Sequence, residues 1–156
     1  MKQRYETKVA TFLILTRENN GKIEILLQER CNTGYMDGMY DAACSGHLEK
    51  GESIAAATVR EAKEEIGITI NEFDLELVEV IHSYKEDYFN TFFTVKKYVG
   101  EPKIMEPTKC HDLSWFDIEN LPENTIYRIK NVIKNIKNKI LYDDDDFTHQ
   151  KNKLGK

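Results

Sequence analysis

The fold of this chain is decided by residues 46–68, which read GHLEKGESIAAATVREAKEEIGI. This stretch predicts a helix from Ser53 to Ile66, because Ser53 is a good N-cap residue and Gly67 stands where a left-handed C-cap residue is needed. At 100° per residue, one face of that helix is small and apolar, which suits close packing on a sheet. This face comprises Ala55, Val59, Ala62 and Ile66.

A second face of the predicted helix carries three glutamates. Glu61, Glu64 and Glu65 are spaced i, i+3 and i+4, so their carboxylates are neighbours. Like charges at these spacings destabilise a helix by roughly a few tenths of a kcal/mol per pair, and the last turn favours cations over anions. Glutamate is also simply a good helix former on a solvated face. Crowding of carboxylates at the unfavourable end nevertheless indicates a site for a hard cation such as Mg²⁺.

The sequence predicts strands on both sides of this helix. Upstream we expect strands at Lys8–Thr16 and Ile23–Leu27 in a hairpin that turns at Glu18-Asn19-Asn20-Gly21, a loop at Cys31–Tyr40 and a short strand at Asp41–Leu48. Downstream we expect strands at Leu75–Tyr84, Tyr88–Val99 and Leu113–Phe116, a loop at Pro102–Lys109, and a helix at Glu123–Tyr142. This order indicates an α/β sandwich with helices on the faces of the sheet.

The length of the chain suits one domain, which we expect to span residues 1–142. Five isoleucines at helical spacing form an apolar stripe on the last predicted helix, which we interpret as core packing. They are Ile126, Ile129, Ile133, Ile136 and Ile140. Residues 143–156 begin with Asp143-Asp144-Asp145-Asp146 and carry Lys151, Lys153 and Lys156. A charge run of this kind is typical of a solvated, mobile tail.

Composition excludes several classes of protein. Hydrophobic residues make up 40% and charged residues 31%, as in ordinary globular proteins. No apolar stretch is long enough for a membrane span, and the first residues show no secretory signal, so we expect a cytoplasmic protein without a membrane partner. The net charge of −5 argues against extended nucleic-acid binding. The three cysteines fit no zinc motif, and we expect them to be reduced thiols.

Residues 46–68 resemble the Nudix box, in which G, five residues, E and seven residues precede R-E-U-x-E-E-x-G-U, with U a bulky aliphatic residue. Every fixed position matches, namely Gly46, Glu52, Arg60, Glu61, Glu64, Glu65 and Gly67. The one departure is Ala62, which is smaller than the pattern prefers but lies on the packing face. The flanking strands and the last helix also agree with the family over residues 4–142, so the resemblance implies a Nudix-type α/β/α sandwich around a mixed β-sheet.

The resemblance implies a role for each polar residue of the box. Glu64 and Glu65 would be the principal ligands of Mg²⁺, for which Mn²⁺ can substitute, and the carbonyl of Gly46 would join them. Glu61 would be a ligand or the group that orients and deprotonates water. Arg60 would hold the glutamates in register, and Glu52 would support them from the start of the helix. Many family members add one more acid from a later loop, and here Glu106 is the candidate, with Glu86 and Asp87 as alternatives.

The resemblance also implies an activity and a class of substrate. The enzyme would be a pyrophosphohydrolase of MutT type, cutting the diphosphate bond of a small nucleotide, and we expect a nucleoside triphosphate, oxidised or not, to give monophosphate and pyrophosphate. Substrate-binding candidates are Arg30 and Tyr35 in the 30–38 loop and Asn124, which could read a base edge or be an ordinary N-cap. Tyr84 and Phe89 could stack on a base, although aromatic residues in strands are more often core residues.

Three alternatives to this activity remain open. ADP-ribose, dinucleoside polyphosphates or capped RNA ends could be the substrate instead. An isomerase of the isopentenyl diphosphate type has a related fold and needs a metal and a catalytic cysteine, and Cys44 precedes Ser45 and Gly46 here. A non-catalytic ligand-binding module is the third, but such modules usually lose glutamates that this chain keeps. We expect Cys44 and Ser45 to be structural, since water is the nucleophile in the hydrolysis.

Overall fold

The computed structural model describes residues 1–145, and two sheets and two helices form its frame. The strands are β1 (Lys8–Leu13), β2 (Thr16–Asn19), β3 (Lys22–Arg30), β4 (Tyr40–Asp41), β5 (Cys44–His47), β6 (Leu75–Ser83), β7 (Tyr88–Val95), β8 (Cys110–Asp117) and β9 (Tyr142–Asp144). The helices are α1 (Ile54–Ile66) and α2 (Tyr127–Lys137), with a 3-10 turn at Glu72–Asp74. None of these helices is long and apolar enough to span a membrane.

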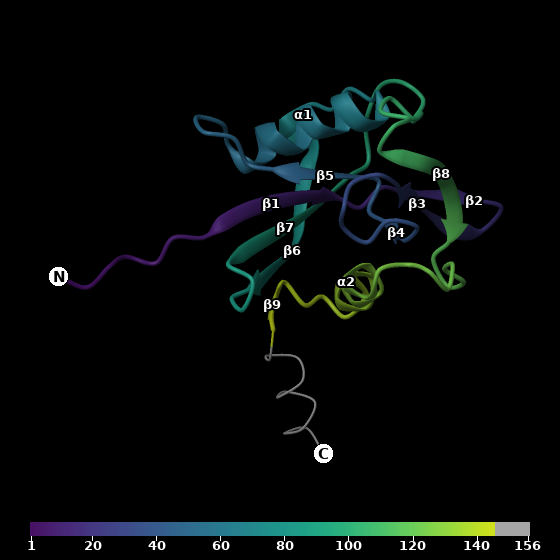
Figure 1. Cartoon of the computed structure of the whole chain (residues 1–156). Coiled ribbons are helices and arrows are strands. Elements are labelled where there is room, and N and C mark those ends of the chain that lie inside the picture. The colour runs from purple at the N-terminus through teal and green to yellow at the C-terminus, as the bar shows by residue number, and fades with distance from the viewer. Residues whose placement is uncertain (146–156) are drawn as a thin grey trace, which may run out of the picture.

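The larger sheet is mixed, as the sequence predicted. Its order is β5-β1-β7-β6-β9, with β1 parallel to β7 and antiparallel to β5. Phe12 and Leu13 are consecutive on β1, so their side chains leave opposite faces of the sheet. Phe12 packs in a cluster with Ile129 and Val132 of α2, whereas Leu13 packs with residues of α1. The two helices therefore cover opposite faces, as Figure 1 shows with α1 above the strands and α2 below them.

The second sheet is antiparallel and is built around β3. β8 pairs with one edge of β3, while β2 and β4 pair with successive parts of it. The prediction of one strand over Lys8–Thr16 is wrong at its C-terminal end. Strand β1 stops at Leu13, and the chain resumes at Thr16 as β2 in the other sheet. The predicted turn at Asn20-Gly21 is confirmed, but it joins β3 to β2. The predicted strand Asp41–Leu48 likewise divides into β4 and β5, which belong to different sheets.

The last helix is shorter than predicted. It ends at Lys137, because Asn138 is its C-cap and Lys139 adopts a positive φ of 55°, a left-handed conformation that stops a helix. Ile140 thus lies outside the helix, and β9 follows and pairs in parallel with β6. Asp143, which the sequence assigned to a solvated tail, is buried in this strand. The rest of that tail, from Asp146 onward, lies outside the described residues.

Candidate functional site

Helix α1 sets the position of the glutamates, and its predicted ends are confirmed. The Ser53 hydroxyl accepts a hydrogen bond from the Ala56 amide, and Gly67 is left-handed with φ 72°. The buried residues Ala57, Ala62 and Ile66 hold the helix against the mixed sheet. These contacts fix the rotation of α1, so that its glutamate face meets the backbone of β5, the edge strand of that sheet.

Glu61 lies directly against the backbone of Gly46 in β5. A Cβ atom added at Gly46 would stand 1.9 Å from Oε1 of Glu61, so only glycine leaves room for this carboxylate. Burial raises the pKa of Glu61, while the hydrogen bond and charge of Arg60 lower it and the negative charge of Glu64 raises it further. The glycine of the motif therefore serves to let a half-buried carboxylate reach the strand.

Glu65 is held one residue earlier along the same strand. Its Oε2 accepts hydrogen bonds from the backbone amide of Ser45 at 3.0 Å and from the amide side chain of Gln28 at 3.2 Å. Burial raises the pKa of Glu65 to about 7, and the charges of Glu61 and Glu106 act in the same direction. The site thus keeps a carboxylate partly desolvated and close to other carboxylates, which is unfavourable unless a cation joins them.

Arg60 ties three of the acidic side chains of the motif together. It donates to both carboxylate oxygens of Glu52, at 3.1 and 2.8 Å, to Glu61 at 2.7 Å and to Glu64 at 3.3 Å. It also donates to the carbonyl of His47 at 3.1 Å. Glu52 and Glu61 raise the pKa of Arg60, and Arg60 in turn lowers the pKa of Glu52. Glu64 is the most exposed of the group, with 55% of its side chain accessible.

The loop after β7 brings Glu106 to the same place. The amides of Lys103 and Met105 donate to the carbonyls of Ile66 and Glu65, which anchors this loop on the last turn of α1. Glu106 and Glu65 then line one cavity together. By contrast, Asp87 lies in the turn before β7 and accepts a hydrogen bond from Tyr5.

Two adjoining cavities open over the motif. The cavity of about 370 Å³, here called the acidic cavity, contains Glu65, Glu106, Lys109 and Gln28 in its wall. The cavity of about 430 Å³, here called the aromatic cavity, contains Phe12, Tyr35, Tyr88, Asn90 and Arg128. Five residues line both, namely Arg30, Thr33, Ser45, Gly46 and His47. A ligand lying across these shared residues would reach from the glutamates to the aromatic side chains.

The structure brings two of the three predicted substrate-binding residues to these cavities. Arg30 is fixed by Asp41 at 3.3 Å and by the carbonyl of Tyr35 at 2.8 Å. Tyr35 lines the aromatic cavity. Asn124 lines neither, because its amide donates to the carbonyl of Gly38 at 2.8 Å and so secures the loop.

The two further aromatic candidates also lie outside both cavities. Phe89 stacks on His82 with ring centroids 4.1 Å apart, and Tyr84 meets the same histidine edge-on at 5.9 Å. Glu86, which we considered as an extra acid, lines the aromatic cavity rather than the acidic one. The residues that could stack on a base are therefore Tyr35 and Tyr88, since the ring of Phe12 is already stacked on Phe92.

The two buried cysteines, Cys44 and Cys110, do not present an activated thiol. Cys44 is buried among Leu13, Ala62 and Ile66 and lines neither cavity. Burial raises the pKa of its thiol well above the ordinary value, and the charges of Glu65 and Glu61 raise it further. Cys110 lines the acidic cavity, but burial raises its pKa to about 11. Because the thiolate is the nucleophilic form, these two side chains are suited to packing.

The donor set of the site matches a hard divalent cation in its chemistry. All the candidate side chains are carboxylates, which are donors that Mg²⁺ prefers. Within residues 1–145 no three His, Cys, Asp or Glu side chains already converge as a ligand set. Glu61 and Glu64 are instead turned toward Arg60. A cation shared by these carboxylates would therefore compete with Arg60 for them.

Sequence reasoning missed several residues that build the site. Gln28 holds Glu65, and a signal for it existed, because Gln28 is the polar residue after the buried run Ile25-Leu26-Leu27. His47 donates to or accepts from the hydroxyl of Tyr88 at 2.9 Å, which joins β5 to β7 across the cavity wall. No sequence signal predicted this pair, since the parallel pairing that brings β7 near β5 is a tertiary feature.

Comparison with known proteins agrees with these observations. The family profile described as NUDIX domain matches residues 6–136. A curated isopentenyl-diphosphate Delta-isomerase from Serratia proteamaculans is 29% identical over 126 residues, which cover 73% of this chain and 64% of the relative. The NAD-capped RNA hydrolase NudC of Stutzerimonas stutzeri is 28% identical over 90 residues, which cover 56% of this chain and 30% of the relative. The chain thus spans less than two thirds of either relative.

Solved structures share the fold. A MutT NUDIX hydrolase from Burkholderia pseudomallei superimposes with a TM-score of 0.70 at 23% identity, covering 81% of this chain and 95% of that one. The NUDIX domain of Shewanella oneidensis NrtR, in complex with ADP ribose, superimposes with a TM-score of 0.68 at 12% identity, covering 88% and 90%. At these identities the likeness establishes the architecture, and the chemistry depends on the side chains described above.

Proposed function

The chain belongs to the Nudix family, and from this premise we propose that it is a pyrophosphohydrolase that cuts the diphosphate bond of a small nucleotide with the help of a divalent cation. One observation supports this proposal above the others. The carboxylates of Glu61 and Glu65 meet the backbone of β5 at Gly46 and Ser45, and these two strand residues line both cavities. Acidic groups for a cation and space for a nucleotide therefore adjoin.

Each acidic residue has a role in the proposed reaction. Glu64 and Glu65 would hold Mg²⁺ or Mn²⁺ together with the carbonyl of Gly46, and Glu61 would either join them or act on the attacking water. When bound, the cation screens the phosphate oxygens and stabilises the charge on the departing phosphate. Arg60 orients Glu61 and Glu64 through the hydrogen bonds it donates to them. The geometry fits this role, because one planar guanidinium fixes carboxylates from both the loop and the helix.

A carboxylate must also take the proton of the attacking water. Glu61 and Glu106 are the candidates, and burial favours Glu61, because desolvation raises its pKa and so makes it a better proton acceptor. Glu106 is paired with Lys109 at 3.4 Å. We therefore favour Glu61 as the group that orients the water and accepts its proton, while Glu106 adds negative charge in the wall of the acidic cavity.

The aromatic cavity supports a nucleoside as the other part of the substrate. Its volume is within the range typical of small-molecule sites. Tyr35 and Tyr88 offer rings for stacking, and Arg30 stands where the two cavities join. We propose a nucleoside triphosphate, cut to monophosphate and pyrophosphate, as the first substrate to test. ADP-ribose is the second, because it carries the same diphosphate linkage and the fold accommodates it in the NrtR domain.

The test is a substrate panel with product analysis. Nucleoside triphosphates, ADP-ribose and a dinucleoside polyphosphate are incubated with the protein and Mg²⁺ in ¹⁸O-labelled water. We expect monophosphate and pyrophosphate from a triphosphate, with the label in one of the two products. Cleavage of ADP-ribose but of no triphosphate would make ADP-ribose the substrate and leave the proposed diphosphate cleavage unchanged. Release of orthophosphate alone would contradict cleavage at an inner diphosphate bond.

The similarity to an isopentenyl-diphosphate Delta-isomerase makes isomerisation the second candidate activity. That chemistry needs a reactive cysteine, whereas Cys44 is buried in the core and its pKa is raised by burial. Replacing Cys44 with alanine should therefore leave hydrolysis at the wild-type rate. An inactive but folded Cys44→Ala variant, together with isomerisation of isopentenyl diphosphate by the wild-type protein, would support the isomerase instead. Ligand binding without any turnover would support a binding module.

A further inference from the structure

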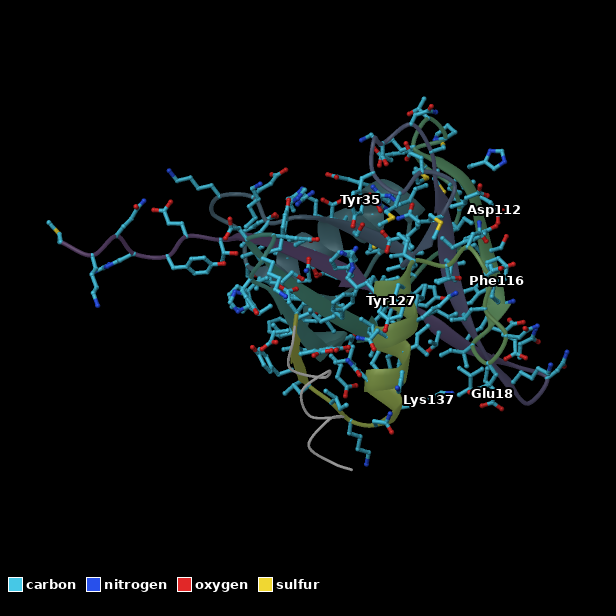
Figure 2. The ribbon with its side chains drawn as sticks, turned by 60° about the horizontal axis from the view of Figure 1, so that its bottom comes forward. Glu18, Tyr35, Asp112, Phe116, Tyr127 and Lys137 are labelled. Atoms are coloured by element: carbon cyan, nitrogen blue, oxygen red, sulfur yellow. The ribbon has the colours of Figure 1, made fainter. Side chains whose placement is uncertain are left out.

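Arg128 is a cationic side chain of the aromatic cavity that the proposed chemistry does not use. It is the second residue of α2, and its guanidinium carbon lies 4.7 Å from the ring centroid of Phe12 on β1. Both side chains line the cavity. Figure 2 shows α2 running from Tyr127 to Lys137, with its Tyr127 end toward Tyr35. Arg128 and Tyr35 both line the cavity.

Within the described chain, the guanidinium of Arg128 lacks an anionic partner. Its Nε–H group is buried and donates no hydrogen bond to any acceptor within residues 1–145. Three other arginines differ in this respect, because Arg17 pairs with Glu24, Arg30 with Asp41 and Arg60 with the glutamates of the motif. The guanidinium of Arg128 is therefore held over an aromatic ring with its hydrogen-bonding capacity still available.

The surroundings of Arg128 give this charge little compensation. The first turn of α2 contains no acidic residue, and the dipole of a helix disfavours a cation at its N-terminal end. The guanidinium lies over the apolar ring of Phe12. Two carboxylates line the same cavity, those of Asp41 and Glu86. Asp41 pairs with Arg30, and within residues 1–145 neither carboxylate forms an ion pair with Arg128. A partly desolvated cation is unfavourable without a partner, and stacking on one ring offsets only part of that cost. An anion that enters the cavity would complete the set of interactions.

We propose that Arg128 is a specificity-determining residue that binds a second phosphate of the substrate, separate from the diphosphate that is cleaved. This inference rests on the proposed function, since it takes the acidic cavity as the place of the diphosphate. A neutral acceptor, such as the edge of a base, would use the guanidinium hydrogens but leave the charge uncompensated. A phosphate accepts the guanidinium hydrogens and also compensates the positive charge, because its anionic oxygens match the forked geometry of an arginine side chain.

The substrate class that follows is a nucleotide with a phosphate on its ribose in addition to the 5′-diphosphate. The nucleoside would lie between Tyr35 and Tyr88, with its 5′ end toward Gly46 and its ribose phosphate toward α2. Asn90, buried on β7, lines the same cavity and offers a further polar contact. The position of the phosphate, at the 2′ or the 3′ oxygen, is decided by the experiment below.

The test compares binding of bisphosphates with that of the matching monophosphates. Adenosine 5′-monophosphate, 2′,5′-bisphosphate and 3′,5′-bisphosphate are titrated into the protein with Mg²⁺ by calorimetry, and the guanosine set is measured in parallel. We expect one bisphosphate to bind about 10- to 100-fold more tightly than the monophosphate, as a charge-assisted hydrogen bond predicts. Arg128→Gln should remove this difference without changing the affinity for monophosphate.

Two further variants make the outcome specific. Arg128→Lys keeps the positive charge but loses the two-pronged guanidinium geometry, so it should retain part of the preference for the bisphosphate over the monophosphate. Arg17→Gln removes an arginine from β2, outside both cavities, and should keep all of it. If Arg128→Gln does not fold, the comparison between wild-type protein and Arg128→Lys decides the matter.

Two outcomes would overturn the inference. The first is equal affinity of the wild-type protein for mono- and bisphosphates, and the second is a preference that survives in Arg128→Gln. Neither outcome would contradict the proposed function, which fails only if no compound of the substrate panel is cleaved at a diphosphate bond. A protein that hydrolyses diphosphates without preferring a ribose phosphate would thus retain the activity and lose the role of Arg128.

Discussion

Replacing Gly46 with alanine tests the geometry of the site at a single atom. The added Cβ would lie 1.9 Å from Oε1, 2.1 Å from Cδ and 2.7 Å from Cγ of Glu61. To reach an ordinary contact of 3.4 Å, the carboxylate must retreat by about 1.5 Å. The backbone carbonyl of Gly46 stays in place, so the substitution acts on Glu61 and spares the other proposed ligand.

The expected effect is large on activity and small on stability. A misplacement of about 1 Å at a reacting group can lower the rate by roughly 100-fold, and we expect kcat/KM of Gly46→Ala to fall by at least about that factor. The clash involves the end of a flexible side chain, and Gly46 does not have a positive φ. The free energy of unfolding should therefore change by no more than about 1 kcal/mol.

The assay combines hydrolysis with a direct measurement of metal binding. Turnover of the best substrate of the panel is measured with Mg²⁺, and Mn²⁺ affinity is followed by electron paramagnetic resonance. The matched control is a double-mutant cycle with Glu61→Ala, in which Gly46→Ala should have no further effect because the clashing carboxylate is gone. Full activity of Gly46→Ala would refute the argument, and so would an equal loss in the Glu61→Ala background.

Three further predictions concern metal, the buried ligand and pH. Excess chelator should abolish hydrolysis, and Mg²⁺ or Mn²⁺ should restore it; turnover that persists in chelator would exclude the proposed cation. Glu65→Gln should lower kcat by about two orders of magnitude or more, because a ligand charge is lost. It should also raise the melting temperature without metal, since burial raises the pKa of Glu65 to about 7 and the charged form is unfavourable; wild-type turnover would show that this carboxylate is dispensable. Glu79 lies outside the motif, buried on β6 beside Asn135 of α2, and burial raises its pKa from 4.5 to about 7. The folded protein therefore binds more protons than the unfolded chain between these values, so stability should fall as pH rises from about 4.5 to 7. Thermal unfolding of Glu79→Gln should show a smaller fall than the wild type, and the exposed control Glu76→Gln should not differ from wild type.

The sequence by itself determined the helix and its chemistry. Ser53 and Gly67 fixed the two ends of α1, and the i, i+3, i+4 spacing placed the three glutamates on one face, because both depend on local backbone geometry. The mixed sheet with helices on both faces also followed from the order of elements and the family motif. Arg60 was predicted to hold the glutamates, and four hydrogen bonds to Glu52, Glu61 and Glu64 are present.

The tertiary structure alone decided which residues meet around that helix. Strand divisions at Ile14-Leu15 and at Ala42-Ala43 send neighbouring segments into different sheets, and no local pattern marks the break, because the residues at both divisions are themselves buried and apolar. Asp143 reads as part of a charged tail, yet it is buried beside β6 through a pairing of strands far apart in sequence. Arg128 and Phe12 likewise meet only because α2 packs on β1, and Gln28 reaches Glu65 only because β3 passes below α1. Local spacing sets the side chains of one helix, whereas contacts between distant segments depend on how the whole core packs.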